Sequence, residues 1–224
     1  MNDGQAGLLP LRLGFVKAFL LRGAGKHVLV DSGTAGNLAK IVAQLERGGI
    51  NLRDIGLVVV SHAHPDHTGS LTAVVQATGA RVAAHRLETE HLRTGMQPPA
   101  AQSRLSRFFF RPSTKPSASG VEPDILVDDE LDLNPYGVAG KVIWTPGHTR
   151  GSLSVMLVSG EAIVGDLVLP RFMAFGPPAI AFWAASREDS LASIRKVLDL
   201  RPSTMFTSHG GPYAPSALAG LARR

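Results

Sequence analysis

The sequence is built around residues 61–67, Ser61-His62-Ala63-His64-Pro65-Asp66-His67, where three of the chain's eight histidines lie beside an aspartate. The apolar, β-branched run Leu57-Val58-Val59-Val60 precedes it and predicts a buried strand. The residues that follow, Thr68-Gly69-Ser70 and then 71–75, predict a turn and a helix with a Ser or Thr as its N-cap. We therefore expect the cluster on a loop between a strand and a helix, where side chains can converge on one point.

A dense group of histidines with an aspartate indicates a metal site. Imidazole nitrogens and carboxylate oxygens are ligands that zinc and similar divalent ions take. A histidine purification tag is the alternative, but a tag lies at a terminus without an interleaved aspartate or a preceding strand. Two ions about 3.5–4 Å apart need more ligands than this loop supplies, so further ligands are expected elsewhere in the chain.

The composition is that of an ordinary globular protein, with 44% hydrophobic and 18% charged residues, and the length suits one domain over residues 1–224. The chain has no cysteine, which excludes disulfides, thiolate ligands and a cysteine nucleophile and is compatible with a cytoplasmic protein. We expect neither a secretory signal nor a membrane span. The formal charge is +5, and the basic residues are dispersed except in Arg104–Lys115 and Arg223-Arg224, so nucleic acid is not an expected partner.

Hydrophobic patterns predict strands in two batches, each followed by helices, which favours an α/β sandwich of two similar halves. Residues Leu11–Leu21 and His27–Val30 are expected to form a hairpin around Gly23-Ala24-Gly25. His85 and His91 lack clustered partners and are expected to be polar residues at the surface or the rim, outside the site. Further strands are expected at 81–84, 125–127, 131–133, 141–144, 153–158, 162–164 and 204–207, and helices at 38–47, 71–77, 86–93, 188–200 and 216–223.

Residues 95–123 differ in composition from the rest of the chain. They are rich in proline and serine and contain arginines beside the apolar triplet Phe108-Phe109-Phe110. An insertion of this kind predicts either a lid over a site, to which Phe108 and Phe109 would contribute, or a contact between the subunits of a homodimer. The alternative is a helix that packs the three phenylalanines into the core.

Three further imidazole or carboxylate groups follow expected strands. His148 ends the sequence Thr145-Pro146-Gly147-His148, Asp166 follows a glycine, and His209 precedes two glycines. Small residues and prolines allow the sharp turns that bring a backbone close to bound ions. One histidine in a turn is weak evidence, but the repetition predicts that these groups line one edge of the sandwich. Asp31, at a strand end, is expected to cap loop amides or to orient a histidine.

These motifs, in this order, resemble those of the metallo-β-lactamase superfamily over about residues 15–213, and Asp31-Ser32-Gly33 is similar to its first motif. The resemblance implies an αββα sandwich with mixed sheets, helices on both outer faces and two divalent ions, either zinc or alternatively iron or manganese. It implies a catalytic site in which a metal-bridging hydroxide attacks the substrate. The implied ligands are His62, His64 and His148 for one ion and Asp66, His67 and His209 for the other, with Asp166 bridging.

Within this superfamily the motifs favour a hydrolase of an ester, thioester or lactone in a small molecule. True β-lactamases usually lack the bridging aspartate, so β-lactam hydrolysis is expected to be minor. Lactonases of quorum signals often carry a tyrosine at the position of Leu169, and glyoxalase II enzymes continue into a helical domain beyond the position of His209. The alternatives are a redox enzyme like the persulfide dioxygenases, with a single iron held by two histidines and an aspartate, and a non-catalytic metal-binding module.

An aromatic stretch follows Asp166 and runs to Trp183. Phe172, Phe175 and Trp183 in this stretch are expected to line a partly apolar substrate pocket, which favours an acyl or aromatic group over a highly charged one. The alternative is that these aromatic side chains fill the core.

Overall fold

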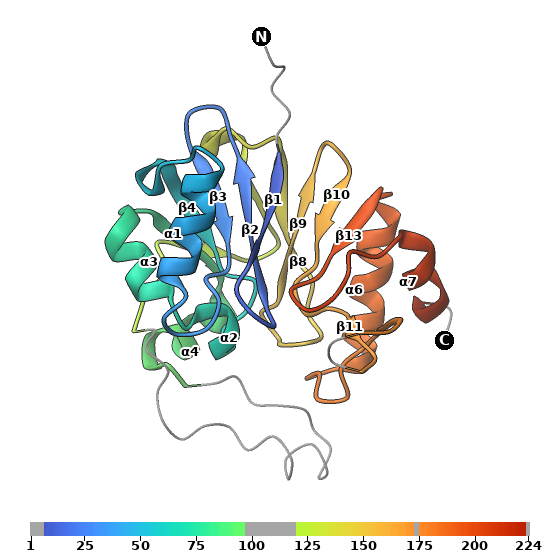
Figure 1. Cartoon of the computed structure of the whole chain (residues 1–224). Helices are drawn as coiled ribbons and strands as arrows, with labels where there is room; N and C mark the ends of the chain where they lie inside the picture. Colours follow the sequence, from blue (N-terminus) through green and yellow to red (C-terminus); the bar gives the residue numbers. More distant parts are fainter. Residues whose placement is uncertain (1–6, 97–119, 173–174, 223–224) are drawn as a thin grey trace.

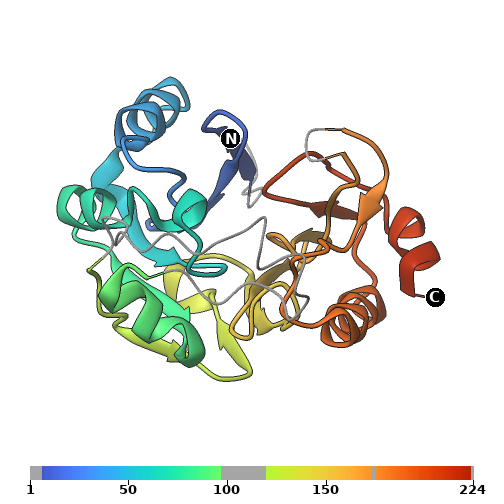
Figure 2. The same ribbon diagram turned by 90° about the horizontal axis from the view of Figure 1, so that it is seen from below.

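The computed structural model describes residues 7–96, 120–172 and 175–222. Two β-sheets are stacked face to face, and helices cover the outer face of each sheet (Figure 1). Seen from below, the helices of residues 38–78 and those of residues 187–222 lie on opposite outer sides of the molecule (Figure 2). The expected αββα sandwich with mixed sheets is confirmed.

The first sheet has six strands in the order β1-β2-β3-β4-β5-β6. The first three pair antiparallel, and β3 to β6 pair parallel. Parallel neighbours need a crossover connection, which α1 provides between β3 and β4 and α3 provides between β4 and β5. The strands are Leu8–Arg12, Lys17–Arg22, His27–Val30, Ile55–Val59, Arg81–His85 and Ile125–Val127, and the helices on this side are α1 (Leu38–Arg47), η1 (Leu52–Asp54), α2 (Pro65–Thr68), α3 (Leu71–Thr78), η2 (Arg86–Glu88) and α4 (Thr89–Thr94).

The second sheet has five strands in the order β13-β10-β9-β8-β7. Only β10 and β13 pair parallel, and α6 provides their crossover. A small hairpin of β11 and β12 lies apart from both sheets. The elements of this half are β7 (Glu130–Asp132), η3 (Asn134–Tyr136), β8 (Gly140–Trp144), β9 (Leu153–Leu157), β10 (Glu161–Ile163), β11 (Leu169–Pro170), β12 (Pro178–Ala179), α6 (Arg187–Asp199), β13 (Thr204–Phe206) and α7 (Pro215–Ala222).

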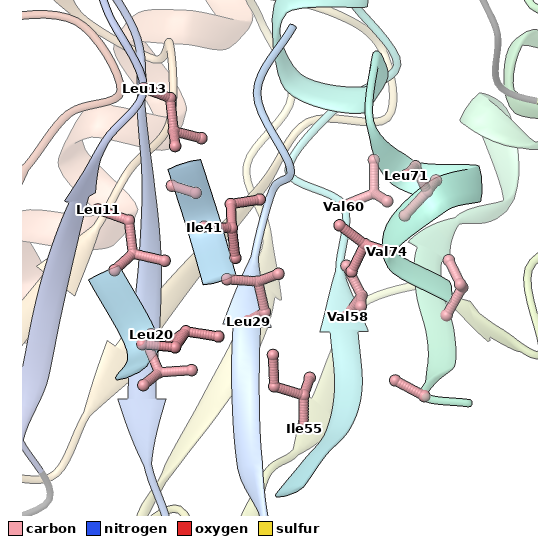
Figure 3. Close-up of a cluster of buried hydrophobic side chains, with 14 of the residues drawn as sticks. Leu11, Leu13, Leu20, Leu29, Ile41, Ile55, Val58, Val60, Leu71 and Val74 are labelled. Carbon is pink, nitrogen blue, oxygen red and sulfur yellow. The ribbon is translucent and has the colours of Figure 1, made fainter. Parts of the chain in front are cut away.

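Three apolar layers hold the sandwich together, because each sheet has one face against the other sheet and one against helices. Between the first sheet and its helices, Ile41 of α1 and Leu71 of α3 pack with Leu29 and Val58 of the strands (Figure 3). The layer between the two sheets includes Phe19, Val59, Val142 and Val155. The third layer packs Ile194 and Val197 of α6 and Leu218 of α7 onto Met156, Ala162 and Met205.

Strand direction decides where the functional loops meet. In the second sheet β8 and β10 both run antiparallel to β9, and β13 runs parallel to β10, so these three strands end at one edge. The loop after β4 reaches the same place, since Leu153 N donates to Ser61 O at 2.8 Å and joins the two sheets there. The ends of β4, β8, β10 and β13 therefore lie together.

Several local expectations are wrong. Residues Leu11–Leu21 form two strands rather than one, because the chain turns back at 13–16, where Gly14 has a φ of 107°. Ser70 occupies the N-cap position of α3, but its hydroxyl donates to Thr34 O instead of capping the helix. His85 is buried, not at the surface, because its ring stacks on Trp144 and its Nε2 lies 3.1 Å from Asp128 O.

The helix α2 and the hairpin of β11 and β12 were not expected, since two- to four-residue elements carry no readable periodicity. The predictions for Phe108, Phe109 and a lid or subunit contact at 95–123 concern residues that lie almost wholly outside the described part of the chain. In the described part of the chain, no helix combines the length and the apolar character that a bilayer span requires.

Candidate metal centre

Four segments bring seven ligand-type side chains to one end of the sandwich. The loop after β4 carries four of them, and the turns after β8, β10 and β13 carry one each. All seven were expected from the sequence: His62, His64, Asp66, His67, His148, Asp166 and His209.

Six of these residues form two groups of three. In the first trio (His62, His64 and His148), His64 Nδ1 lies 3.0 Å from His62 Nε2 and 3.0 Å from His148 Nε2. In the second trio (Asp66, His67 and His209), Asp66 Oδ2 lies 3.7 Å from His67 Nε2 and 3.1 Å from His209 Nε2. Each trio presents its ligand atoms to a common point.

The Oδ2 atom of Asp166 lies between the two trios. It is 3.7 Å from His148 Nε2 of the first trio and 3.6 Å and 3.4 Å from His67 Nε2 and His209 Nε2 of the second. A tetrahedral ion with bonds of about 2.0–2.1 Å has ligand atoms about 3.3 Å apart, and the distances of the two trios taken together, from 3.0 to 3.7 Å, bracket this value. Each trio therefore has a donor set and a spacing that would suit a divalent ion, and Asp166 stands between the two trios.

Unpaired buried atoms also point to a cation. His67 Nε2 and Asp166 Oδ1 are buried and have no hydrogen-bond partner among the described residues. Such atoms are costly to bury without a partner. A metal ion would satisfy His67 Nε2, which faces both Asp66 and Asp166.

Asp31 contacts one histidine of the second trio directly and one of the first trio through Ser61. The sequence predicted that it would cap loop amides or orient a histidine. Its Oδ2 lies 2.8 Å from His67 Nδ1 and accepts a hydrogen bond from Ser61 Oγ at 2.7 Å, and its Oδ1 accepts from Ser61 N. Ser61 Oγ is in turn 3.1 Å from His62 Nδ1. These contacts place a proton on the Nδ1 atoms of His67 and His62, which leaves their Nε2 atoms free to bind an ion.

The first trio is neutral without an ion. Burial lowers the pKa of His64 to about 4 and that of His148 to about 3. Burial, reinforced by the neighbouring His67, also brings the pKa of His62 well below its usual range. Neutral imidazole is the form that binds metal, so this trio needs no deprotonation at neutral pH.

The second trio is an ion-pair cluster without an ion. Burial opposes a charge on His67, but the Asp166 and Asp66 carboxylates outweigh it and raise the pKa of this imidazole well above its usual range. Burial is likewise outweighed at His209, where hydrogen bonds to the same carboxylates raise the pKa to about 9. Burial would raise the pKa of Asp66, but the charge on His67 lowers it to about 2. An ion here would displace protons.

The expected substrate-contacting aromatics are only partly brought to the site. Phe172 and Phe175 are exposed and lie next to each other, with ring centroids 5.6 Å apart. Their hairpin approaches the His209 loop, since Tyr213 OH donates to Gly176 O. Trp183 instead packs on the small cluster around Leu169, as the core alternative suggested for it.

Phe15 is a neighbour of the site that the sequence did not reveal. Its exposed ring stacks on His209, with centroids 5.7 Å apart, and its carbonyl lies 3.0 Å from His209 Nδ1. It stands in the turn between β1 and β2, which the sequence pattern had merged into one strand. No motif marks such a residue, so only its position in the fold reveals it.

Comparison with known proteins agrees with this geometry. The sequence profile described as the metallo-beta-lactamase superfamily matches residues 11–209. The chain belongs to the metallo-β-lactamase superfamily. A B3 metallo-β-lactamase of known structure, BLEG-1, shares this superfamily's fold with a TM-score of 0.72 at 22% identity, covering 96% of this chain and 97% of that one.

Relatives in this superfamily include hydrolases. A protein of Methanocaldococcus jannaschii named "Probable metallo-hydrolase" is 31% identical over 143 residues, which are 64% of this chain and 63% of that protein. The hydroxyacylglutathione hydrolase of Methylobacillus flagellatus is 30% identical over 151 residues, 66% of this chain and 47% of that protein. Membership of the superfamily and these relatives support a metallo-hydrolase.

Proposed function

We propose that this protein is a hydrolase that cleaves an ester, thioester or lactone bond with two divalent metal ions, zinc in the first instance. The observation that carries the proposal is the position of Asp166 Oδ2 between two complete trios. A structural ion needs only one closed set of ligands, whereas two adjacent three-residue sets leave positions for water and substrate.

Two ions held in this way supply a water-derived nucleophile at neutral pH and stabilise the charge that develops on the substrate carbonyl. The protein's own residues orient this chemistry. Asp31 and Ser61 hold the rings of His67 and His62 in orientation through contacts with their Nδ1 atoms. Asp66 is the most open of the site's carboxylates, with 27% of its side chain exposed against 5% for Asp166. Substrate would therefore approach past Asp66 and His209.

The surroundings of this approach support an acyl group with apolar character. Phe15 covers one side of His209, and Phe172 and Phe175 extend from the neighbouring hairpin. All three rings are exposed, and apolar walls with a few polar groups are typical of small-molecule sites. The relative named hydroxyacylglutathione hydrolase supports a thioester among the three bond types.

A mononuclear iron enzyme of the persulfide dioxygenase type is the second candidate. His62, His67 and Asp166 also converge within the same cluster, and two histidines with one carboxylate are the ligand set of many non-haem iron oxygenases. This candidate predicts one iron per chain, oxygen uptake with a persulfide and no hydrolysis.

Metal content and a substrate panel separate the two candidates. The protein is purified without added metal, its ions per chain are counted, and it is tested with esters, thioesters, lactones and β-lactams. We expect about two ions per chain and turnover of one of the first three classes. One iron per chain with oxygen uptake would contradict the hydrolase.

Single ligand variants test the dinuclear site. His64→Ala and Asp166→Ala should each abolish turnover, since the first removes a ligand of one trio and the second removes the shared carboxylate. His27→Ala is the matched control, because His27 starts β3 and lies at the strand end away from the site. Steady-state rates of the three variants measure turnover, and circular dichroism shows whether each variant is folded. Full activity in a folded His64→Ala or Asp166→Ala protein would contradict the proposal.

A further inference from the structure

Glu88 is a buried acidic residue that no catalytic role explains. It ends η2 and is 1% exposed. Burying a carboxylate is costly unless its oxygens are hydrogen-bonded. Among the described residues it forms no ion pair with a lysine, an arginine or a histidine. Its two oxygens instead accept hydrogen bonds from backbone amides of two different loops.

The first amide lies between two expected ligands. Glu88 Oε2 accepts from Ala63 N at 2.9 Å, and Ala63 stands between His62 and His64 in the chain. The carboxylate therefore holds the centre of the segment that supplies two of the three nitrogens of the first trio.

The second amide lies in the turn that supplies the third nitrogen. Glu88 Oε1 accepts from Gly151 N at 3.0 Å. Within this turn Thr149 N donates to Ser152 Oγ and Gly147 N donates to Thr149 O. These bonds connect the residues on both sides of His148, so we expect a shift of Gly151 to move His148 as well.

Gly151 is shaped to this carboxylate. A Cβ atom at this position would lie 2.6 Å from Glu88 Cγ and 2.7 Å from Glu88 Oε1, closer than real contacts allow. The two residues lie 63 positions apart in the chain, and their contact packs η2 closely against the turn.

We propose that Glu88 is a positioning residue that sets the distance between the His62–His64 segment and the His148 turn, and so sets the affinity of the first trio for its ion. The inference rests on the metal centre of the proposed function. The two side-chain hydrogen bonds that Glu88 accepts come from Ala63 N and Gly151 N, and not from the second trio. Its effect is therefore specific to one of the two ions, and a purely structural role would not show this selectivity.

The decisive variant is Glu88→Gln, with Glu90→Gln as its matched control. Glutamine keeps one acceptor oxygen but turns an NH₂ group toward the other backbone N–H, so one of the two loops loses its tether. The fold should survive, because Leu153 N still donates to Ser61 O. Glu90 lies two residues further along and is exposed, with its carboxylate paired to Arg93.

Two measurements are made on wild type and both variants. Cadmium NMR during competition with a chelator follows the site of the first trio and the site of the second trio as separate resonances. We expect Glu88→Gln to weaken the site of the first trio about 10–100-fold and to leave the other site at its wild-type affinity. Hydrogen exchange in the metal-free protein should become faster at Ala63 N or Gly151 N in Glu88→Gln alone.

The outcomes separate this inference from the proposed function. Equal weakening of both sites in Glu88→Gln, or no weakening of either, overturns the positioning role even if the wild-type protein hydrolyses its substrate. Selective weakening in a protein that binds two ions but hydrolyses nothing supports the positioning role and contradicts the hydrolase. A wild-type protein that binds no ion contradicts both.

Discussion

Asp31 concentrates several functions in one side chain. Its backbone has a φ of 63°, in the left-handed region that most residues avoid, although Asp and Asn tolerate it better than others. The side chain is buried and reaches His67 directly and His62 through Ser61. One carboxylate thus orients one histidine of each trio. Strain of this kind persists where the surrounding contacts hold the residue in place.

Two substitutions at Asp31 separate charge from backbone strain. Asp31→Asn keeps a side chain that tolerates the left-handed region, but its NH₂ group cannot accept the hydrogen bond that His67 Nδ1–H donates to Asp31 Oδ2. We expect metal affinity to fall about 10–100-fold. Asp31→Ala should lose the same affinity and, in addition, about 1–2 kcal/mol of unfolding free energy. Chelator competition and urea denaturation measure the two effects, and equal stability of both variants would contradict a backbone contribution.

At the scale of elements, α6 holds the His148 turn in place. Ser186 N and Ala185 N, at the start of this helix, donate to the carbonyls of Gly147 and His148 at 2.9 Å and 3.0 Å. The hydroxyl of Ser193, further along the helix, donates to Pro146 O at 2.7 Å. The helix thus positions one ligand of the first trio through the backbone.

Gly147 allows this close approach because it has no side chain. Replacing glycine with alanine should therefore change the unfolding free energy in opposite directions at Gly147 and at Gly220. Gly147 has a φ of 144°, and a Cβ there would lie 2.5 Å from Ser190 N. Gly147→Ala should therefore lower the unfolding free energy by about 2–3 kcal/mol. Gly220→Ala, in α7, meets no atom within 4 Å and should raise it by about 0.5–1 kcal/mol. Denaturant unfolding measures both, and a loss of similar size at each glycine would contradict the packing argument.

At the scale of the whole molecule, the two trios give the metal-free protein opposite pH dependences. The pKa values of His64 (about 4) and His148 (about 3) lie below the value of 6.5 for an unperturbed histidine. Their contribution to stability is fully present above pH 6.5 and is lost as the pH falls toward these values. The pKa of His209 is raised to about 9, so its contribution is fully present below pH 6.5 and is lost as the pH rises through 9.

The unfolding free energy of the metal-free protein should therefore be greatest near pH 6.5. Urea denaturation from about pH 4.5 to about pH 9 tests this. Zinc should stabilise the protein most on the alkaline side, where the ion no longer competes with the proton on His209. A stability that rises steadily up to pH 9 without metal would contradict the ion-pair cluster.

Much of the fold and the ligand set followed from local patterns in the sequence. The helix at 38–47 and the strand at 125–127 have the expected bounds, because hydrophobic periodicity is a property of neighbouring residues. The seven ligand-type residues were recognisable because each follows a strand, and strands of one direction end at one edge. The ligand roles themselves stay a prediction until ions are measured.

Other features arise only when distant segments meet. His85 lies outside the site and against Trp144, and Phe15 covers His209 across the join between the two sheets. Glu88 lies in a three-residue helix that carries no pattern, and its partners Ala63 and Gly151 are 25 and 63 positions away. Periodicity and motifs record the preferences of a local stretch of chain. Burial, stacking and shared hydrogen bonds depend on which stretches pack together, so they emerge only in the folded molecule.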